Sequence, residues 1–350
     1  MKLTEEILNY AVVGGAILGG GGGGSRESGM RVGKAALMYA SPELISIDEV
    51  DPEMLIVTAS AVGAPAAKTG MATPRDYVHA VQMLEQQMGC KMGGIITNEN
   101  GGTATINGWI QSAVLGIPLI DAPCNGRAHP TGTMGSMGLN NVAGFVSYQA
   151  AVGGNPDLGN YMELTVSGSL GHCASMIRKT ADAAGGLVAV ARNPVKASYV
   201  KAHGAVGGVS HAIDTGRAHA EGMKKSPQAA IEAVAAFLKG KIVVSGKVDE
   251  LKLETVNAFD VGRVLIGRCE MTFWNEYMTL ENGAERLMTF PDLIATFDLK
   301  TGLPVTSAEI AKGQEIAIVA TSRSNIRLGA GCIDPALLKE IEPIINKTVL

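Results

Sequence analysis

Residues 94–120 read GIITNENGGTATINGWIQSAVLGIPLI. Residues 94–97 form a short apolar run that is typical of a buried strand, and residues 103–115 are predicted to form a helix. A second apolar run at 117–120 follows and ends in a polar loop. Strands that alternate with helices in this way indicate an α/β fold with a mostly parallel sheet and flanking helices.

The same alternation extends outward on both sides of this stretch. We expect further strands at 54–59, 161–166 and 187–191. Helices are expected at 4–18, 25–40, 74–89, 170–184 and 226–240, and the first two flank six consecutive glycines, 19–24.

From residue 241 the pattern changes to short strands without intervening helices, which favours a smaller all-β, barrel-like domain or a sandwich. The expected strands lie at 241–245, 252–257, 263–268, 270–279, 293–297 and 315–320. We therefore predict an α/β domain over 1–240 and a small β-barrel domain over 241–325. A closing helix at 335–345, within a C-terminal segment 326–350, is expected to rejoin the first domain.

The composition excludes several classes of function. Of 350 residues, 46% are hydrophobic and only 18% are charged, with a net charge of −4. This balance gives no basic surface for nucleic acid or for an anionic membrane. A surface so poor in charge indicates subunit contacts, so we expect a homo-oligomer.

The cysteines and the N-terminus both favour a soluble, cytoplasmic protein. Five cysteines form an odd number without regular spacing, which fits a reducing compartment better than a disulfide framework. The apolar stretch at 11–20 resembles a signal peptide, but Glu5 and Glu6 occupy the place of its basic region. No apolar run reaches membrane-spanning length.

The loop at 121–130, DAPCNGRAHP, combines a thiol, a guanidinium and an imidazole within six positions. Loops after strands carry the chemistry of many α/β enzymes, so Cys124 is a candidate nucleophile. Arg127 and His129 are candidates to lower the pKa of its thiol. The alternative is that Cys124 is a small apolar residue that plugs the end of a strand.

Carboxylates lie at the ends of two neighbouring predicted strands. Asp121 is expected to orient a base, to bind substrate N–H groups, or only to cap its loop. Asn98, Glu99 and Asn100 occupy the equivalent place after the preceding strand, and Glu99 is the candidate carboxylate base. A solvated loop residue is the alternative for Glu99.

The glycine run is a candidate ligand loop, because bare backbone amides can approach an anion or a ring edge. It fits neither a phosphate-binding P-loop nor a dinucleotide fingerprint, and a tightly packed turn is the alternative. The predicted substrate-binding residues are Gly21, Gly22, Gly23, Gly24, Ser25, Asn98, Asn100, Gly101, Asn125 and His172.

A metal site receives little support from the sequence. His172 and Cys173, combined with Cys124 and His129, would make a set of two cysteines and two histidines for zinc. Their spacing matches no compact metal motif, so we predict no metal site and no other cofactor.

The chain resembles the S-methyl thiohydantoin desulfurase family, whose members are often encoded beside hydantoinases. The resemblance spans nearly the whole chain and rests on ordered short motifs: Gly15-Ala16-Ile17-Leu18 with the glycines and Ser25, Glu99-x-Gly101-Gly102, Gly116-Ile117-Pro118-Leu119-Ile120-Asp121-Ala122, Gly126-Arg127-Ala128-x-Pro130, Pro291-Asp292-Leu293-Ile294, Asp298-x-x-Thr301-Gly302-x-Pro304 and Gly313.

This resemblance implies an α/β domain joined to a β-barrel domain and a thiohydantoin or hydantoin-like substrate whose C–S bond is hydrolysed. Many members read Asp-Ala-Asp-Gly where this chain has Asp121-Ala122-Pro123-Cys124. One carboxylate is thus lost and one thiol gained, so substrate and mechanism can both differ from those of the namesake.

Three functional hypotheses follow from these residues. In the first, the chain is a hydrolase in which Cys124 attacks C2 of the ring, Arg127 or loop amides hold the negative charge, and His129 or Glu99 activates water. In a variant, Asp121 with Glu99 activates water and the thiol takes no part. The second hypothesis is a non-catalytic small-molecule-binding subunit that works with a hydantoinase-type partner. The third is a zinc hydrolase that uses Cys124, His129 and His172.

Overall fold

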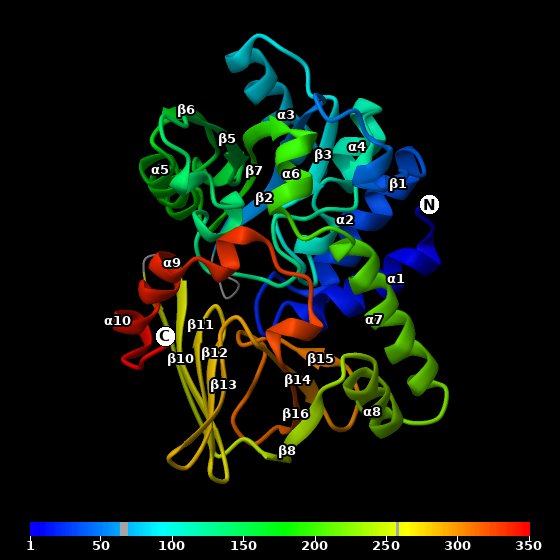
Figure 1. The fold of residues 1–350 in the computed structure, drawn as a ribbon, viewed down its shortest axis with the longest axis vertical. Coiled ribbons are helices and arrows are strands. Elements are labelled where there is room, and N and C mark those ends of the chain that lie inside the picture. The colour runs from blue at the N-terminus through cyan, green and yellow to red at the C-terminus, as the bar shows by residue number, and fades with distance from the viewer. Residues whose placement is uncertain (64–68, 257–258) are drawn as a thin grey trace.

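The computed structural model describes residues 1–63, 69–256 and 259–350. An α/β part is built on a seven-stranded sheet, and a β part contains the two antiparallel sheets formed by β8 to β16 (Figure 1). The helices are α1 (Glu5–Leu18), α2 (Arg26–Tyr39), α3 (Pro74–Met88), α4 (Trp109–Leu115), α5 (Leu170–Ala183), α6 (Ala197–His203), α7 (Gly208–Met223), α8 (Pro227–Phe237), α9 (Pro335–Lys339) and α10 (Glu342–Ile345).

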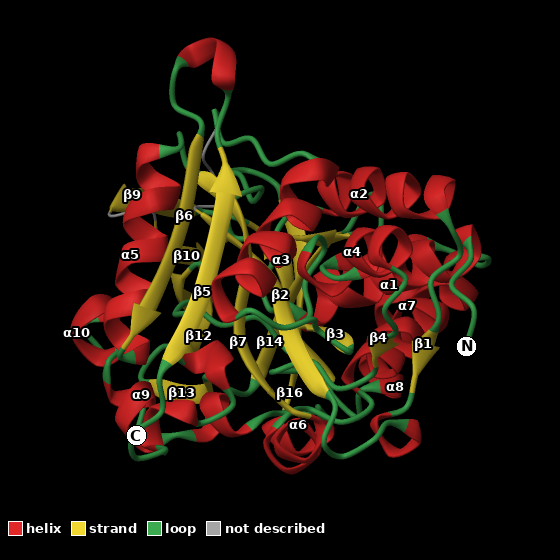
Figure 2. Cartoon of the chain, turned by 90° about the horizontal axis from the view of Figure 1, so that it is seen from above, coloured by secondary structure: helices red, strands yellow, loops and turns green. Residues whose placement is uncertain are grey.

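The seven-stranded sheet has the order β1-β4-β3-β2-β7-β5-β6 (Figure 2). Its strands are β1 (Leu44–Ile45), β2 (Leu55–Gly63), β3 (Gly94–Thr97), β4 (Leu119–Ile120), β5 (Ser147–Gly153), β6 (Met162–Gly168) and β7 (Leu187–Lys196). Alternating residues of β5 face opposite layers. Ala150 and Val152 pack in the cluster that contains residues of α3, whereas Ala151 packs with Ile177 of α5.

The α/β class is confirmed, but the sheet is mixed rather than mostly parallel. The strands β1, β4, β3 and β2 pair in parallel, whereas β7, β5 and β6 pair antiparallel. The parallel half follows from the crossovers through α3 and α4. The antiparallel half arises because β5 and β6 are joined by a short connection, which allows only a hairpin. The sequence does not predict β5, α6 or α7, and the helix expected at 103–115 begins only at Trp109.

The β part is an open pair of sheets, so it does not close into a barrel and agrees instead with the sandwich that the sequence left as the alternative. One sheet has the order β13-β12-β11-β10-β9 and the other β15-β14-β16-β8, and over the described residues the edge strands of the two sheets do not pair. Their inner faces share one apolar cluster, as in a sandwich. The strands are β8 (Lys241–Lys247), β9 (Glu250–Val256), β10 (Phe259–Ile266), β11 (Cys269–Trp274), β12 (Glu276–Asn282), β13 (Glu285–Thr289), β14 (Leu293–Asp298), β15 (Pro304–Val305) and β16 (Glu315–Thr321).

The expected closing helix is interrupted, and α9 and α10 form in its place. Leu337, Leu338 and Ile341 pack with Trp274 of β11, and Met134 of the α/β part joins the same cluster. The C-terminal segment therefore contacts both parts, and the division into domains at residues 240 and 325 stays a prediction.

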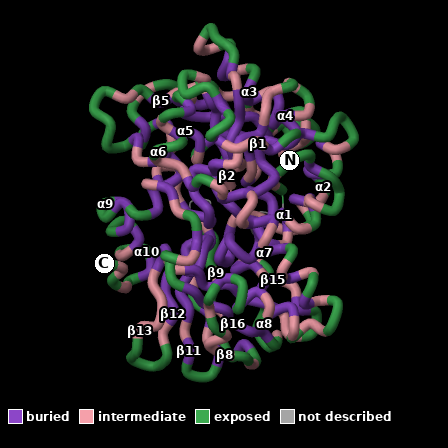
Figure 3. The backbone as a smooth tube through the Cα atoms, turned by 45° about the vertical axis from the view of Figure 1, so that its right-hand side comes forward, coloured by how far each residue is buried: buried purple, intermediate pink, exposed green. Residues whose placement is uncertain are grey.

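Helices α1, α7 and α8 connect the α/β part to the β part. Ile17 of α1, Ala212 of α7 and Ile231 of α8 share an apolar cluster with Leu293 and Phe297 of β14. Figure 3 shows buried backbone continuing through the junction between the two parts. Among the described residues, no helix is both long and apolar enough to cross a bilayer.

Glycines set the close approach of α1 and α7. A Cβ on Gly14 would lie 1.8 Å from the carbonyl oxygen of Ala212, and one on Gly216 would lie 2.0 Å from that of Tyr10. The two backbones are therefore in direct contact, and no side chain fits between them.

We expect Gly14→Ala to lower the free energy of unfolding by on the order of 1–3 kcal/mol, because the methyl group must push α1 away from α7. Gly171→Ala is the matched control, since a Cβ on this glycine of α5 would meet no atom within 4 Å. The control should be neutral or slightly stabilising. Thermal unfolding of both variants tests the contact, and equal midpoints would contradict it.

Candidate functional site

A polar cavity of about 260 Å³ lies where the α/β part meets the β part. The α/β part contributes the end of the glycine run, the loop after β3, the loop at residues 129–132, α5 and β7. The β part contributes the turn between β11 and β12. The principal polar lining residues are Ser25, Asn98, Glu99, Thr103, Asn107, His129, Thr131, Arg178, Arg192, Asn275 and Glu276.

The glycine run packs directly against the loop after β3. Gly23 accepts hydrogen bonds at its carbonyl from the amides of Thr103 (3.0 Å) and Ala104 (2.9 Å). A Cβ on Gly101 would lie only 2.3 Å from the Cα of Gly23, and Gly23 has a φ of +76°. Only glycine at both positions allows this approach, which brings Gly24 and Glu99 to the same cavity.

Glu99 is the carboxyl group at the centre of this cavity. It is 8% exposed, and its Oε2 accepts a hydrogen bond of 3.0 Å from the amide of His129. Burial raises the pKa of Glu99 to about 7, although the His129 amide and the positive charge of Arg192 act in the opposite direction. Near neutral pH the group therefore exists in both forms, as a proton-transferring residue requires.

His129 is a neutral imidazole that lies beside Glu99. Its Nδ1 lies 3.0 Å from the carbonyl of Thr131, and its Nε2 lies 3.2 Å from Oε2 of Glu99 without the angles of a hydrogen bond. Burial lowers the pKa of His129 to about 3. The imidazole is thus a poor base at neutral pH, and Glu99 is the better candidate to accept a proton.

Glu276 brings a second carboxyl group to the cavity, from the start of β12. It is 2% exposed, and burial, followed by the charge of Glu99, raises its pKa well above the ordinary value. Within the described residues its Oε2 has no hydrogen-bond partner. The carboxyl group lies against the glycine run, since a Cβ on Gly22 would sit 1.9 Å from Oε1.

Two arginines face the carboxyl groups, of which Arg178 is half-buried and Arg192 is buried. Arg178 of α5 donates to the carbonyls of Gly63 (3.2 Å) and Pro130 (3.3 Å), and its guanidinium lies 4.1 Å from the ring centroid of Phe259. Arg192 of β7 is 2% exposed. Both arginines and Glu276 are absent from the site residues predicted from the sequence. Arg192 directly follows the apolar run 187–191, which is the same kind of position as that of Asn98, and this signal could have found it.

Of the predicted catalytic and substrate-binding residues, six line the cavity and the other nine lie elsewhere. Those in the lining are Gly23, Gly24, Ser25, Asn98, Glu99 and His129.

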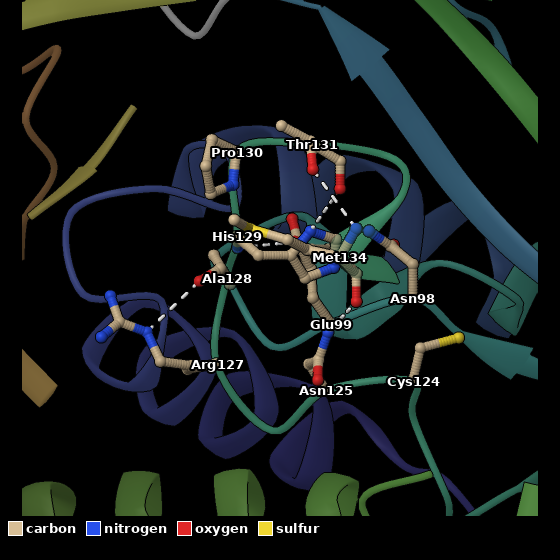
Figure 4. A network of polar contacts seen from close by, with 12 residues as sticks. Asn98, Glu99, Cys124, Asn125, Arg127, Ala128, His129, Pro130, Thr131 and Met134 are labelled. Atoms are coloured by element: carbon tan, nitrogen blue, oxygen red, sulfur yellow. Dashed lines mark hydrogen bonds and ion pairs between the residues drawn. The ribbon is translucent and has the colours of Figure 1, made fainter. Parts of the chain in front are cut away.

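Cys124 is sealed in the core beneath the loop. It is 0% exposed in an apolar cluster with Ile56, Ile96 and Ile120, and its Sγ lies 3.4 Å from Oγ1 of Thr58. Burial raises the pKa of the thiol to about 11. Figure 4 shows the Cys124 side chain directed away from Glu99. This geometry argues against the predicted nucleophile and favours the alternative of an apolar plug.

Asp121 and Arg127 hold the fold together and do not line the cavity. Asp121 accepts hydrogen bonds from the amides of Val209 (2.8 Å) and Ser210 (3.2 Å), so it caps the start of α7. Arg127 is fully buried and donates to the carbonyls of Ala128 and Asp292. Its guanidinium also lies 4.4 Å from the ring centroid of Phe290, so Arg127 ties the α/β part to the β part.

The remaining predicted contacts are also outside the cavity. Asn100 donates to the carbonyl of Gly208 (2.8 Å), and Asn125 donates to that of Met134 (2.9 Å), so both brace loops. The others lie against neighbouring backbone or side chains; they are Gly21, Gly22 and Gly101.

His172 is exposed in the first turn of α5, where its Nδ1 lies 2.9 Å from Oγ of Ser169. Within the described ranges, no three His, Cys, Asp or Glu side chains form a group that could hold a metal ion. The residues of the zinc hypothesis, Cys124, His129 and His172, are therefore not brought together as a metal site.

Comparisons with known proteins agree with the resemblance found in the sequence. Residues 6–156 match a family model described as the S-Me-THD-like N-terminal domain, and residues 171–327 match that of the S-Me-THD-like C-terminal domain. A crystal structure of a protein from Chromobacterium violaceum covers 98% of this chain and 96% of its own, with a TM-score of 0.71 and 20% identity. At that identity the likeness shows the fold alone. No curated protein matches the chain.

The raised pKa of Glu99 makes stability depend on pH. Because Glu99 ionises more readily in the unfolded chain, its contribution to stability should fall as the pH rises from about 4.5 to about 7, by roughly 3 kcal/mol in all. Glu99→Gln removes this titration, so the variant should gain stability relative to the wild type at pH 8 but not at pH 4.5. Denaturant unfolding at both pH values measures the difference. The exposed variant Glu5→Gln serves as control and should follow the wild type.

Proposed function

Because the chain belongs to the S-Me-THD-like family, we propose that it is a hydrolase that cleaves the C–S bond of an S-methyl thiohydantoin or a related five-membered cyclic amide. The observation that carries this proposal is a buried carboxyl group, Glu99, with a pKa of about 7 in a cavity between the two parts. A cavity of about 260 Å³ suits a small ring and its substituents better than a large ligand.

The proposed reaction begins with ionised Glu99 taking a proton from a water molecule. The oxygen of that water bonds to C2 of the ring, and the electron pair of the C2=N bond moves to nitrogen. The pair then returns, the C–S bond breaks, and methanethiolate leaves with the proton from Glu99. One substrate and one water thus give one methanethiol and the 2-hydroxy tautomer of one hydantoin, whose O–H proton then moves to the ring nitrogen.

Neighbouring groups support this role of Glu99. The amide of His129 holds its Oε2 in one place, and the neutral imidazole packs beside it without competing for the proton. Arg178 is fixed by the Gly63 and Pro130 carbonyls, so its positive charge is already oriented when negative charge develops on the ring nitrogen. No covalent step is assigned to Cys124, because a thiol with a pKa of about 11 supplies almost no thiolate at neutral pH.

We expect Glu99→Gln to lower kcat/KM for methanethiol release by 10²–10⁴-fold, the usual contribution of a positioned acid–base group. Cys124→Ala should keep activity within a few-fold of the wild type, apart from some loss of stability. Methanethiol released from a panel of S-methyl thiohydantoins with different ring substituents, detected with a thiol reagent, measures both. Loss of turnover in the Ala variant while it remains folded would restore the covalent route.

The pH dependence provides an independent test of the same assignment. Since the ionised form of Glu99 is the base, kcat/KM should rise with pH and level off above about 7. The rising limb should disappear in the residual activity of Glu99→Gln. A rate that falls as the pH rises from 5 to 7 would contradict the assignment.

A further inference from the structure

A second cavity of about 380 Å³ opens beside the first and is continuous with its lining. The two cavities share five lining residues, Val62, Thr131, Gly132, Arg178 and Arg192. The guanidinium groups of both arginines therefore stand at the boundary between them. A ligand whose ring lies beside Glu99 can extend a substituent past this boundary.

Arg192 differs in its contacts from Arg127 and Arg178. Arg127 and Arg178 both donate to backbone carbonyls. For Arg192, which is 2% exposed, no hydrogen bond or ion pair with any described residue is found, and its buried Nε lacks a partner. The charge of Glu99 acts on Arg192, but not through a hydrogen bond. A buried guanidinium that donates no hydrogen bond is costly to a fold, and an anion with two oxygens would relieve this cost.

The guanidinium of Arg192 lies at the boundary between the two cavities. A Cβ on Gly132, which lines both cavities, would lie 2.8 Å from one terminal nitrogen of Arg192. A Cβ on Gly135 would lie 2.9 Å from Nε2 of His129 and 3.7 Å from the other terminal nitrogen of Arg192. The free guanidinium thus lies next to the imidazole that contacts Glu99.

We propose that Arg192 binds a carboxylate carried by the substrate, so that the chain acts on cyclic amides with a short acidic substituent. This inference rests on the proposed function and names its substrate class. The ring lies beside Glu99, and the substituent reaches the boundary between the cavities. Ala174, Ile177 and Phe259 line the second cavity and can cover the methylene groups of such a substituent.

The other charges around the second cavity do not outweigh Arg192. Lys179 adds a further positive charge, whereas Asp182 and Glu340 are negative. Both carboxylates are exposed, so water and salt screen them, while Arg192 acts from a buried position. Among the charges that line the second cavity, the buried charge of Arg192 is therefore the one that is best placed to bind an anion.

The test uses product hydantoins, which bind without turnover. We compare 5-(2-carboxyethyl)hydantoin with its amide, 5-(2-carbamoylethyl)hydantoin, by isothermal titration calorimetry at pH 7.5. The wild type should bind the acid at least tenfold more tightly than the amide. Arg192→Gln should reduce this preference to less than threefold, whereas Lys179→Gln should keep most of it. Equal binding of the two compounds by the wild type, or an unchanged preference in Arg192→Gln, overturns the proposal.

The stability of the Arg192→Gln variant is measured as well, so that a loss of binding can be distinguished from a loss of folding. Removal of an unpaired buried charge should leave the unfolding midpoint of Arg192→Gln unchanged or raise it, and a fall of more than about 5 °C would show that Arg192 stabilises the fold and so contradict the proposal. Arg192→Lys keeps the positive charge but cannot donate two parallel hydrogen bonds to a carboxylate. It should therefore show an intermediate preference for the acid over the amide.

Failure of the proposed function is distinguishable from failure of this inference. A protein that releases no methanethiol from any thiohydantoin, yet binds the acid through Arg192, would refute the desulfurisation and support the anion site. A protein that releases methanethiol equally well from acidic and neutral substrates would refute the anion site alone.

Discussion

The contact between two glycine-containing loops is the constraint on which the site depends. The glycine run that follows α1 and the loop after β3 are in direct backbone contact, at Gly23 and Gly101. This contact fixes Glu99 relative to the start of α2. It also leaves room for the carboxyl group of Glu276 to lie against Gly22. A side chain at either contact position would separate the walls of the cavity.

Burial then determines the electrostatics of the site. Glu99, Glu276, Arg178 and Arg192 all lie where water is largely excluded, so each affects the protonation of the others more strongly than it would at a surface. The result is a carboxyl group, Glu99, whose pKa lies near neutral pH, beside a histidine, His129, that is uncharged there. Such a pair of opposite shifts is a common way to assign acid–base roles within one site.

Local patterns in the sequence predicted the parallel half of the sheet and placed Asn98, Glu99 and His129 in the site. They could not predict Glu276, because it reaches the cavity from β12, more than a hundred residues away and across the junction of the two parts. Cys124 looked reactive because it lies near Arg127 and His129 in the chain. In the folded loop these side chains point in different directions (Figure 4), so proximity in sequence did not become proximity in space. Whether the chain forms homo-oligomers or has a hydantoinase-type partner stays a prediction.

The distribution of thiols has a practical consequence for chemical labelling. Cys124, Cys173, Cys269 and Cys332 are all buried, whereas Cys90, just beyond the end of α3, is exposed. Maleimide dyes and spin probes should therefore attach to a single surface position that does not line the cavity beside Glu99. The native chain thus offers a reporter handle for fluorescence or electron paramagnetic resonance without removal of any cysteine.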